Sequence, residues 1–233
     1  MGRIRIKNEI EIERNPVERI LISVKDFFRT NFRPALFALL GFLIAACLTV
    51  AFLAYRETAV EKNMIEFEKI MKEYESIEAS KNREDIGKII VRVKEFTSST
   101  FFGFHHDLGY YLLGNLYFSE RQFKEAGQCL LTFAGKVSDP MLKSVALFKA
   151  GAAAEESGDL DSALEIYMKL ENIKKDNIVE DQVYYCMARV YEAKGDLINS
   201  KKYLNMLISG FPQSPLTESA RKRLIMMPLG NKK

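Results

Sequence analysis

The residues of this chain that could perform acid–base or metal chemistry are few and poorly spaced. The two histidines, His105 and His106, are adjacent and fall in a segment that we expect to be a loop. Neighbouring residues do not form a metal site by themselves. The sequence contains no glycine-rich phosphate loop and no nucleophile motif beside them. We therefore predict that the chain is not an enzyme and that it has no catalytic residues, no metal and no cofactor.

The three cysteines also lack the spacing of a reactive site. Cys47 lies in a long apolar run, and Cys129 and Cys186 are 57 positions apart. No close-spaced pair of the metal or redox type is present. Free cysteine behaves as a small apolar residue, so we expect Cys129 and Cys186 to be buried, unpaired thiols.

Recognition chemistry, in contrast, recurs at a regular interval. Tyr111, Phe148 and Tyr185 are each 37 residues apart, and Asn115 and Arg189 follow two of them by four residues. Aromatic side chains provide a large contact area at low entropic cost. We predict that these five residues line a groove that binds an extended peptide or a partner helix. The alternative is that the three rings pack against a neighbouring helix.

The interval of 37 belongs to a helical repeat. Windows at 107–140, 144–177 and 181–214 align with one another and satisfy most of the tetratricopeptide repeat (TPR) pattern. Each window has a small residue for close helix contact in its first helix and another in its second helix: Gly114, Gly151 and Ala188, then Ala126, Ala163 and Ser200. The predicted fold is all-α, with one N-terminal transmembrane helix followed by a TPR-type solenoid of three to four repeats and a capping helix.

The boundaries of the solenoid domain are predicted at residues 56 and 226, with a tail at 227–233. A degenerate helix pair at 57–96 precedes the three windows, and Thr97–Thr100 reads as a loop. Gly158-Asp159 and Gly195-Asp196 form turns within two windows, where the first window has Glu120-Arg121-Gln122. A final helix from Pro215 is expected to cap the last repeat, with Ala220 and Leu224 inward and Arg221–Arg223 outward.

The apolar run at 35–55 predicts the membrane anchor. It has 21 residues and no charge. As a helix it would be about 32 Å long, against a bilayer core of about 30 Å. Two other interpretations are a cleaved signal peptide and a lipoprotein signal, since Ile44–Cys47 resembles a lipobox. The run is long for a signal peptide and stays apolar after Cys47, which favours an uncleaved span.

Charge predicts the orientation of this span. The head, residues 1–33, holds eight Lys and Arg, whereas the part after the span carries 26 basic and 26 acidic residues. Because positive flanks stay in the cytoplasm, we predict a bacterial inner-membrane protein with a cytoplasmic N-terminus and a periplasmic C-terminal domain. The balanced charge of that domain argues against a nucleic-acid partner.

The head contains two segments. Residues 3–13 alternate isoleucine with charge, which fits either a hairpin or a disordered tail. Residues 16–30 predict a basic amphipathic helix that Asn15 would cap, with its apolar stripe at Val17, Ile20, Leu21, Val24, Phe27 and Phe28. Such a helix would lie in the membrane interface or dock on a partner protein.

This layout resembles the YfgM-like family, the ancillary subunits of the bacterial SecYEG translocon, above all at Val24-Lys25-Asp26-Phe27-Phe28 before the span. The resemblance implies an accessory, chaperone-like protein whose partners are the translocon, a periplasmic chaperone or client chains, with no small-molecule substrate. The ending Phe211–Pro215 also resembles repeats of periplasmic envelope proteins, such as the division coordinator and the outer-membrane assembly lipoprotein. The alternative function is therefore a static scaffold of cell-envelope or cell-division complexes.

Overall fold

The regular structure of this chain is entirely helical in every segment that can be described. The computed structural model describes residues 16–30, 32–80, 85–99, 103–171, 173 and 179–228, which contain ten helices. The prediction of an all-α fold is therefore confirmed. The segment 3–13, the proposed cap Asn15 and the last residues of the tail, 229–233, lie outside the described residues. The chain divides into two compact units, Met1–Arg56 and Glu57–Lys233.

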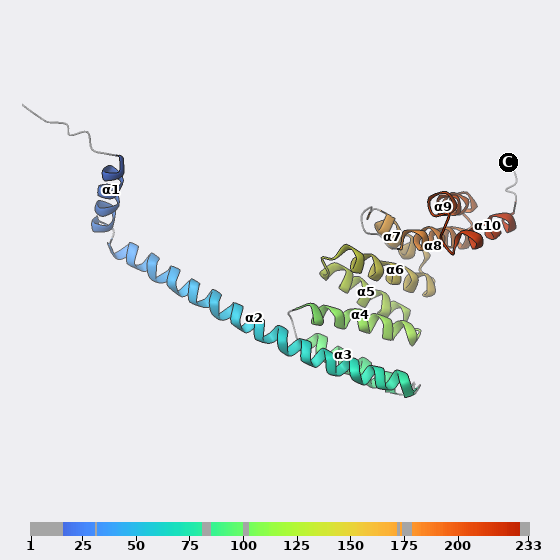
Figure 1. Cartoon of the computed structure of the whole chain (residues 1–233), viewed down its shortest axis with the longest axis horizontal. Coiled ribbons are helices and arrows are strands. Elements are labelled where there is room, and N and C mark those ends of the chain that lie inside the picture. The colour runs from blue at the N-terminus through green and yellow to red at the C-terminus, as the bar shows by residue number, and fades with distance from the viewer. Residues whose placement is uncertain are drawn as a thin grey trace, which may run out of the picture. The chain divides into compact units, whose positions relative to one another are not determined.

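The first unit contains α1 (Pro16–Thr30) and the beginning of α2 (Phe32–Ser80) (Figure 1). The apolar side chains of this part of α2 are exposed; Phe37 and Phe42 each keep 71% of their surface accessible. The helix is long and apolar enough to cross a membrane, and none of its apolar window is buried. This stretch is therefore not a core helix of the chain.

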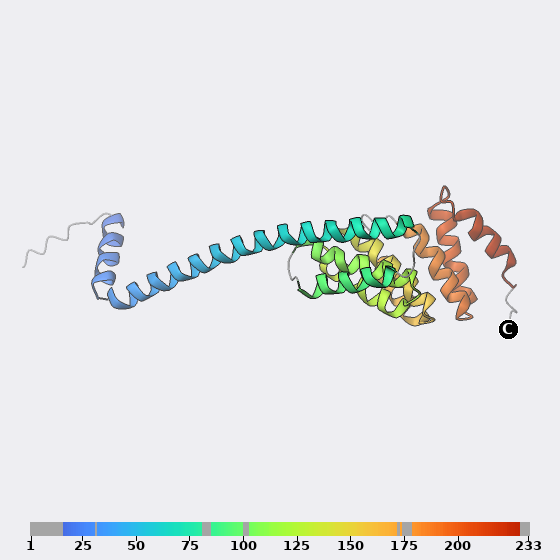
Figure 2. The ribbon, with the colours of Figure 1, turned by 90° about the horizontal axis from the view of Figure 1, so that it is seen from below.

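The second unit is a succession of helices in which each packs on the next. After the end of α2, the helices are α3 (Ile86–Ser99), α4 (Phe104–Ser119), α5 (Phe123–Lys136), α6 (Pro140–Glu156), α7 (Leu160–Glu171), α8 (Glu180–Ala193), α9 (Leu197–Gly210) and α10 (Thr217–Met226). The helices α3 to α10 follow one another through the unit in both views (Figures 1 and 2). The core extends along them in two clusters, one around Ile70 and Ile89 and the other around Tyr167 and Leu204.

The pairs α4–α5, α6–α7 and α8–α9 depend on small residues where the helices meet. A Cβ atom added to Gly114 would lie 2.5 Å from Cγ of Leu130 on α5. A Cβ added to Gly151 would lie 2.8 and 2.9 Å from Cδ1 and Cζ of the Tyr167 ring on α7, and closer still to Cε1. The third position holds Ala188, which is fully buried. These distances leave no space for a larger side chain.

The turn inside each pair places one residue in the left-handed region at the same interval of 37. Gly158 and Gly195 have φ values of 82° and 79°, as their turns were predicted to require, and Arg121 has φ of 59° at the equivalent position of the first pair. A non-glycine residue in this region is strained because its Cβ approaches the following carbonyl oxygen. The first turn therefore has the geometry of the other two without their glycine.

An aspartate after each of these two glycines starts the second helix of its pair. Asp159 accepts a hydrogen bond of 3.0 Å from the Ser162 amide, and Asp196 accepts one of 3.1 Å from the Asn199 amide. The side chains of Ser162 and Asn199 bond to the same carboxylates, and these hydrogen bonds lower the pKa of both aspartates. The Gly-Asp pair thus supplies both the turn and the helix cap.

The predicted loop at Thr97–Thr100 is wrong for the three residues that are described. Thr97, Ser98 and Ser99 form the last turn of α3. Each hydroxyl donates to the carbonyl three residues earlier, over 3.0, 3.0 and 3.3 Å respectively. These bonds give the three hydroxyls partners within their own helix, so a polar run that favours a loop extends the helix here.

We predict that Gly151→Leu destabilises the second unit by about 1–3 kcal/mol, the typical cost of overpacking. The Tyr167 ring would have to move, and it is fully buried. Gly135→Leu on α5 is the matched control, because a Cβ there meets nothing within 4 Å. Chemical denaturation of both variants measures the difference. Equal free energies of unfolding would mean that Gly151 is not at a close helix contact.

We also predict that Arg121→Gly stabilises the fold by up to about 1 kcal/mol, since glycine adopts φ of 59° without strain. Gly158→Ala should have the opposite effect and cost about 1 kcal/mol. No atom lies within 4 Å of a Cβ added to Gly158, so its change isolates backbone conformation. Thermal melts provide the comparison, and destabilisation by Arg121→Gly would show that the arginine side chain outweighs the strain.

Candidate partner-binding surface

The three predicted recognition rings occupy equivalent places on alternate helices. Tyr111 lies on α4, Phe148 on α6 and Tyr185 on α8, and we call them the aromatic column. Each ring is half-buried and packs against the main core cluster. Sequence reasoning left two interpretations open, a groove lining and a contact with a neighbouring helix. The structure gives each ring one packed side and one accessible part.

Tyr111 is held from two sides. Its ring centroid lies 5.2 Å from that of Phe133 on α5, and Nζ of Lys149 on α6 lies 4.9 Å above the ring. The same ammonium donates to Oδ1 of Asn115 over 2.5 Å. Nδ2 of Asn115 donates in turn to the carbonyl oxygen of Tyr111. The predicted pair Tyr111 and Asn115 is thus brought together, and Lys149 fixes both.

Phe148 and Arg189 occupy the middle of the surface. The Phe148 ring lies 6.2 Å from the ring of Tyr167, which is on α7. Arg189, on α8, donates through Nε and Nη2 to the two carboxylate oxygens of Glu155 on α6, both over 2.7 Å. These hydrogen bonds raise the pKa of Arg189 above its usual value. Arg189 is therefore committed to a two-point ion pair between helices and is not a free cation.

Tyr185 is covered in part by the last helix. Arg223 of α10 lies 5.8 Å from the centroid of the Tyr185 ring and donates to its hydroxyl over 3.5 Å. It also donates to Oε2 of Glu192 over 2.6 Å. Burial opposes the charge of Arg223, but these hydrogen bonds outweigh it and raise its pKa. The prediction that Arg223 points outward is wrong, because α8 offers it a carboxylate and a hydroxyl.

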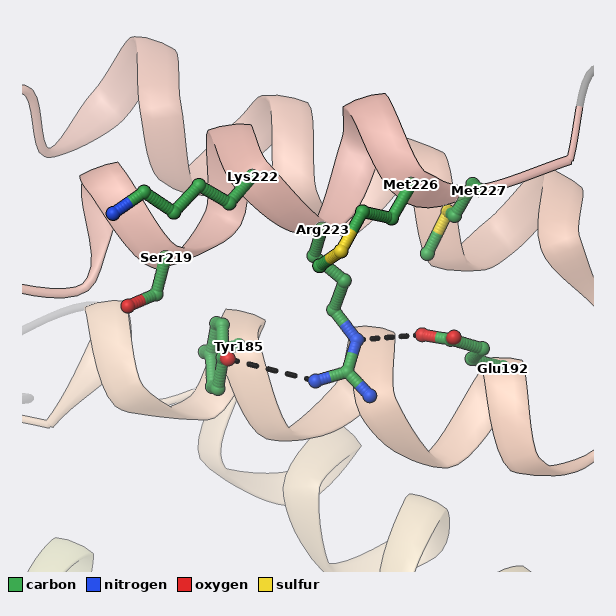
Figure 3. Close-up of a pocket in the computed structure, with 7 residues that line it drawn as sticks. All are labelled: Tyr185, Glu192, Ser219, Lys222, Arg223, Met226 and Met227. Atoms are coloured by element: carbon green, nitrogen blue, oxygen red, sulfur yellow. Dashed lines mark hydrogen bonds and ion pairs between the residues drawn. The ribbon is translucent and has the colours of Figure 1, made fainter.

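A cavity of about 410 Å³ opens beside Tyr185, between α8 and α10. In Figure 3, Arg223 extends from α10 towards α8, with Ser219 and Lys222 near one end and the two methionines near the other. The lining is Tyr185, Glu192, Ser219, Lys222, Arg223, Met226 and Met227. Its volume falls within the range of small-molecule and side-chain pockets. An aromatic ring, flexible thioethers and a few charged groups suit the side chains of a polypeptide.

The aromatic column belongs to a layer of helices that cations join together. Lys149 links α6 to α4, Arg189 links α8 to α6, and Arg223 links α10 to α8. Sequence reasoning named Arg189 as a partner contact and missed the roles of Lys149 and Glu155. A signal was present, since Lys149 and Arg189 each bond to a residue 34 positions earlier in the chain. A cation that follows a polar or acidic residue by 34 positions would have indicated these contacts between helices.

The histidines lie in the first turn of α4, so their predicted place in a loop is wrong. His106 is buried; its Nδ1 lies 3.0 Å from Oδ1 of Asp107, and its Nε2 lies 3.3 Å from the carbonyl oxygen of Thr97. Its ring meets that of Tyr110 edge to face. Within the described residues, no cluster of three or more His, Cys, Asp and Glu could hold a metal. The contact between Nε2 of His106 and the carbonyl oxygen of Thr97 therefore joins α4 to α3.

Cys129 and Cys186 are free thiols on α5 and α8. Cys186 is buried and Cys129 half-buried, and burial raises the pKa of both. A raised pKa keeps a thiol protonated and slow to react. These two cysteines therefore behave as packing residues.

Comparison with known proteins adds little to this description. No family model matches the sequence, and no curated protein matches it. One solved structure that resembles it is described as "Crystal structure of BtubC (BKLC) from P. vanneervenii", with 16% sequence identity and a TM-score of 0.43. The match covers 72% of this chain and spans 64% of that chain's length.

Proposed function

We propose that this chain is a membrane-anchored TPR-type protein that binds polypeptides and performs no catalysis. The observation that carries the proposal is the aromatic column, which places a partly exposed ring at the same position on α4, α6 and α8. At its end lies the cavity with Tyr185 and two methionines. The proposed partners are the secretion translocon, a periplasmic chaperone or client chains.

The cation contacts between neighbouring helices support a recognition role for this surface. Lys149 and Arg223 hold two of the rings before any partner arrives, so little side-chain entropy remains to be lost on binding. Adaptable methionines at the cavity suit partners of varied sequence. Asn115 and Arg189 would add polar contacts at the edges of the column, through hydrogen-bonding groups that their internal hydrogen bonds do not occupy.

The exposed apolar start of α2 supports the anchor. Its apolar window is not buried among the described residues, and the basic head would keep the N-terminus in the cytoplasm by the positive-inside rule. The second unit would then lie in the periplasm of a bacterial cell. The proposed role is that of an accessory, chaperone-like subunit at the inner membrane.

We predict that protease added to spheroplasts digests the second unit and leaves the head intact. The apolar run at 35–55 would stay uncleaved, so the full-length mass should persist in membranes before protease is added. Full protection of the second unit would reverse the proposed orientation. An N-terminus at a lipid-modified Cys47 would replace the helical anchor with a lipid anchor.

We predict that Met226→Glu weakens binding of an unfolded probe, a reduced and alkylated secretory polypeptide, to the full-length protein. Central contacts of an interface often cost about 2 kcal/mol, or roughly thirtyfold in Kd. Ile225→Glu is the matched control. Ile225 is 84% exposed and Met226 is 76% exposed, both on α10, but only Met226 lines the cavity. Fluorescence anisotropy measures both values of Kd.

The column itself is tested with Tyr111→Ala, Phe148→Ala and Tyr185→Ala combined. Because these rings also touch the core, a thermal melt must first show that the triple variant folds. A folded triple variant that binds the probe normally contradicts the proposed groove. Loss of binding in Ile225→Glu but not in Met226→Glu would place the interface outside the cavity. A protein that ignores the unfolded probe but retains a stable co-purifying complex fits the alternative, a static envelope or division scaffold.

A further inference from the structure

The helix α1 presents an apolar face that is exposed in the described part of the chain. Its stripe of large side chains keeps 47–65% of its surface exposed, at Val17, Ile20, Leu21, Val24 and Phe27. At 100° per residue these five positions fall within about one third of the helix circumference. A continuous apolar face exposed on a helix of this length indicates an interaction surface.

Charge indicates what this surface binds. Between residues 16 and 33 the sequence has four basic residues, Arg19, Lys25, Arg29 and Arg33, against two acidic ones. By helical spacing, Lys25 and Arg29 lie beside and behind the apolar stripe. A helix with one apolar face and basic residues around it is typical of binding to an anionic membrane surface.

The position of α1 in the sequence supplies the second argument, which rests on the anchor in the proposed function. One residue, Asn31, separates α1 from α2, whose apolar run at 35–55 would enter the bilayer. One residue spans no more than about 3.6 Å. The end of α1 must then lie at the level of the lipid headgroups, where an apolar face has acyl chains within reach.

We propose that α1 binds the anionic cytoplasmic surface of the membrane, with its apolar stripe in the acyl-chain boundary and its basic residues on lipid phosphates. The ligand is the headgroup layer of the bilayer and not a partner protein. Through this contact, the chain would sense lipid charge at the same membrane that it crosses. The charged ends of lysine and arginine side chains reach the headgroups while their apolar stems stay in the boundary.

The absence of tryptophan from the chain allows a direct test. Val24→Trp places a single reporter in the apolar stripe. Ile22→Trp also replaces an aliphatic residue with tryptophan, but on the opposite side of α1. The full-length variants are reconstituted in vesicles with brominated acyl chains, either of phosphatidylcholine alone or with added phosphatidylglycerol. Since such helices bury their apolar face by about 5–10 Å, we expect quenching of Val24→Trp to be about twofold stronger, or more.

Charge and anchoring are tested with two further variants. Lys25→Gln with Arg29→Gln should weaken the docking of α1 by roughly fivefold for each charge removed, and only in vesicles that contain phosphatidylglycerol. Leu48→Trp reports whether α2 is inserted. The three readings separate failure of the anchor from failure of the inference about α1.

Equal, water-like emission from Val24→Trp and Ile22→Trp, with Leu48→Trp quenched, overturns the proposal. Protection of Val24→Trp that appears only in native membranes would then identify a protein as the cover. Quenching of Val24→Trp while Leu48→Trp stays in water would support lipid binding by α1 and refute the anchor. Quenching that does not depend on phosphatidylglycerol overturns the requirement for anionic lipid.

Discussion

The close approach of the paired helices is the constraint on which the second unit depends. Gly114 and Gly151 bring α4 and α6 so near to α5 and α7 that Leu130 and Tyr167 pack against bare backbone. At the third pair, Ala188 is larger, and the hydroxyl of Ser200 donates to its carbonyl over 2.7 Å. Each contact fixes the distance within a pair. The distance in turn sets where the next pair can stack, because each repeat of this kind touches only its neighbours.

The aromatic column follows from the same spacing. In each window the ring comes three residues before the small residue, so the two lie on nearly the same side of the first helix. The ring therefore packs at the edge of the close contact and is half-buried there. Lys149, Arg189 and Arg223 then connect neighbouring helices of the layer across these rings. The two ion pairs, made by Arg189 and Arg223, are partly exposed, so each contributes modestly to stability. Their larger effect is on geometry, since two-point pairs such as Arg189–Glu155 hold the helices at one relative position.

Periodicity made the helices and their close contacts predictable from the sequence. Small residues at an interval of 37 indicated the contacts at Gly151 and Ala188, and Gly-Asp pairs indicated the turns. Local composition misled where a tertiary or helix-end interaction decided the outcome. The hydroxyl run at Thr97–Ser99 bonds to its own helix, and His106 is buried with polar partners at both ring nitrogens, the carbonyl oxygen of Thr97 and the carboxylate of Asp107. The cavity beside Tyr185 was not predictable, since it needs the path of α10 and the inward turn of Arg223.

The free thiols Cys129 and Cys186 show that the second unit folds without a covalent crosslink. Its folding therefore does not depend on the redox state of the compartment. Helical proteins rich in local contacts fold in microseconds to milliseconds, whereas synthesis of residues 57–233 takes about 10–35 seconds at about 5–20 residues per second. If residues 57–233 stayed in the cytoplasm, each helix pair would fold as soon as it emerged from the ribosome. The apolar segment near the N-terminus, made first, would commit the chain to co-translational export before that could happen.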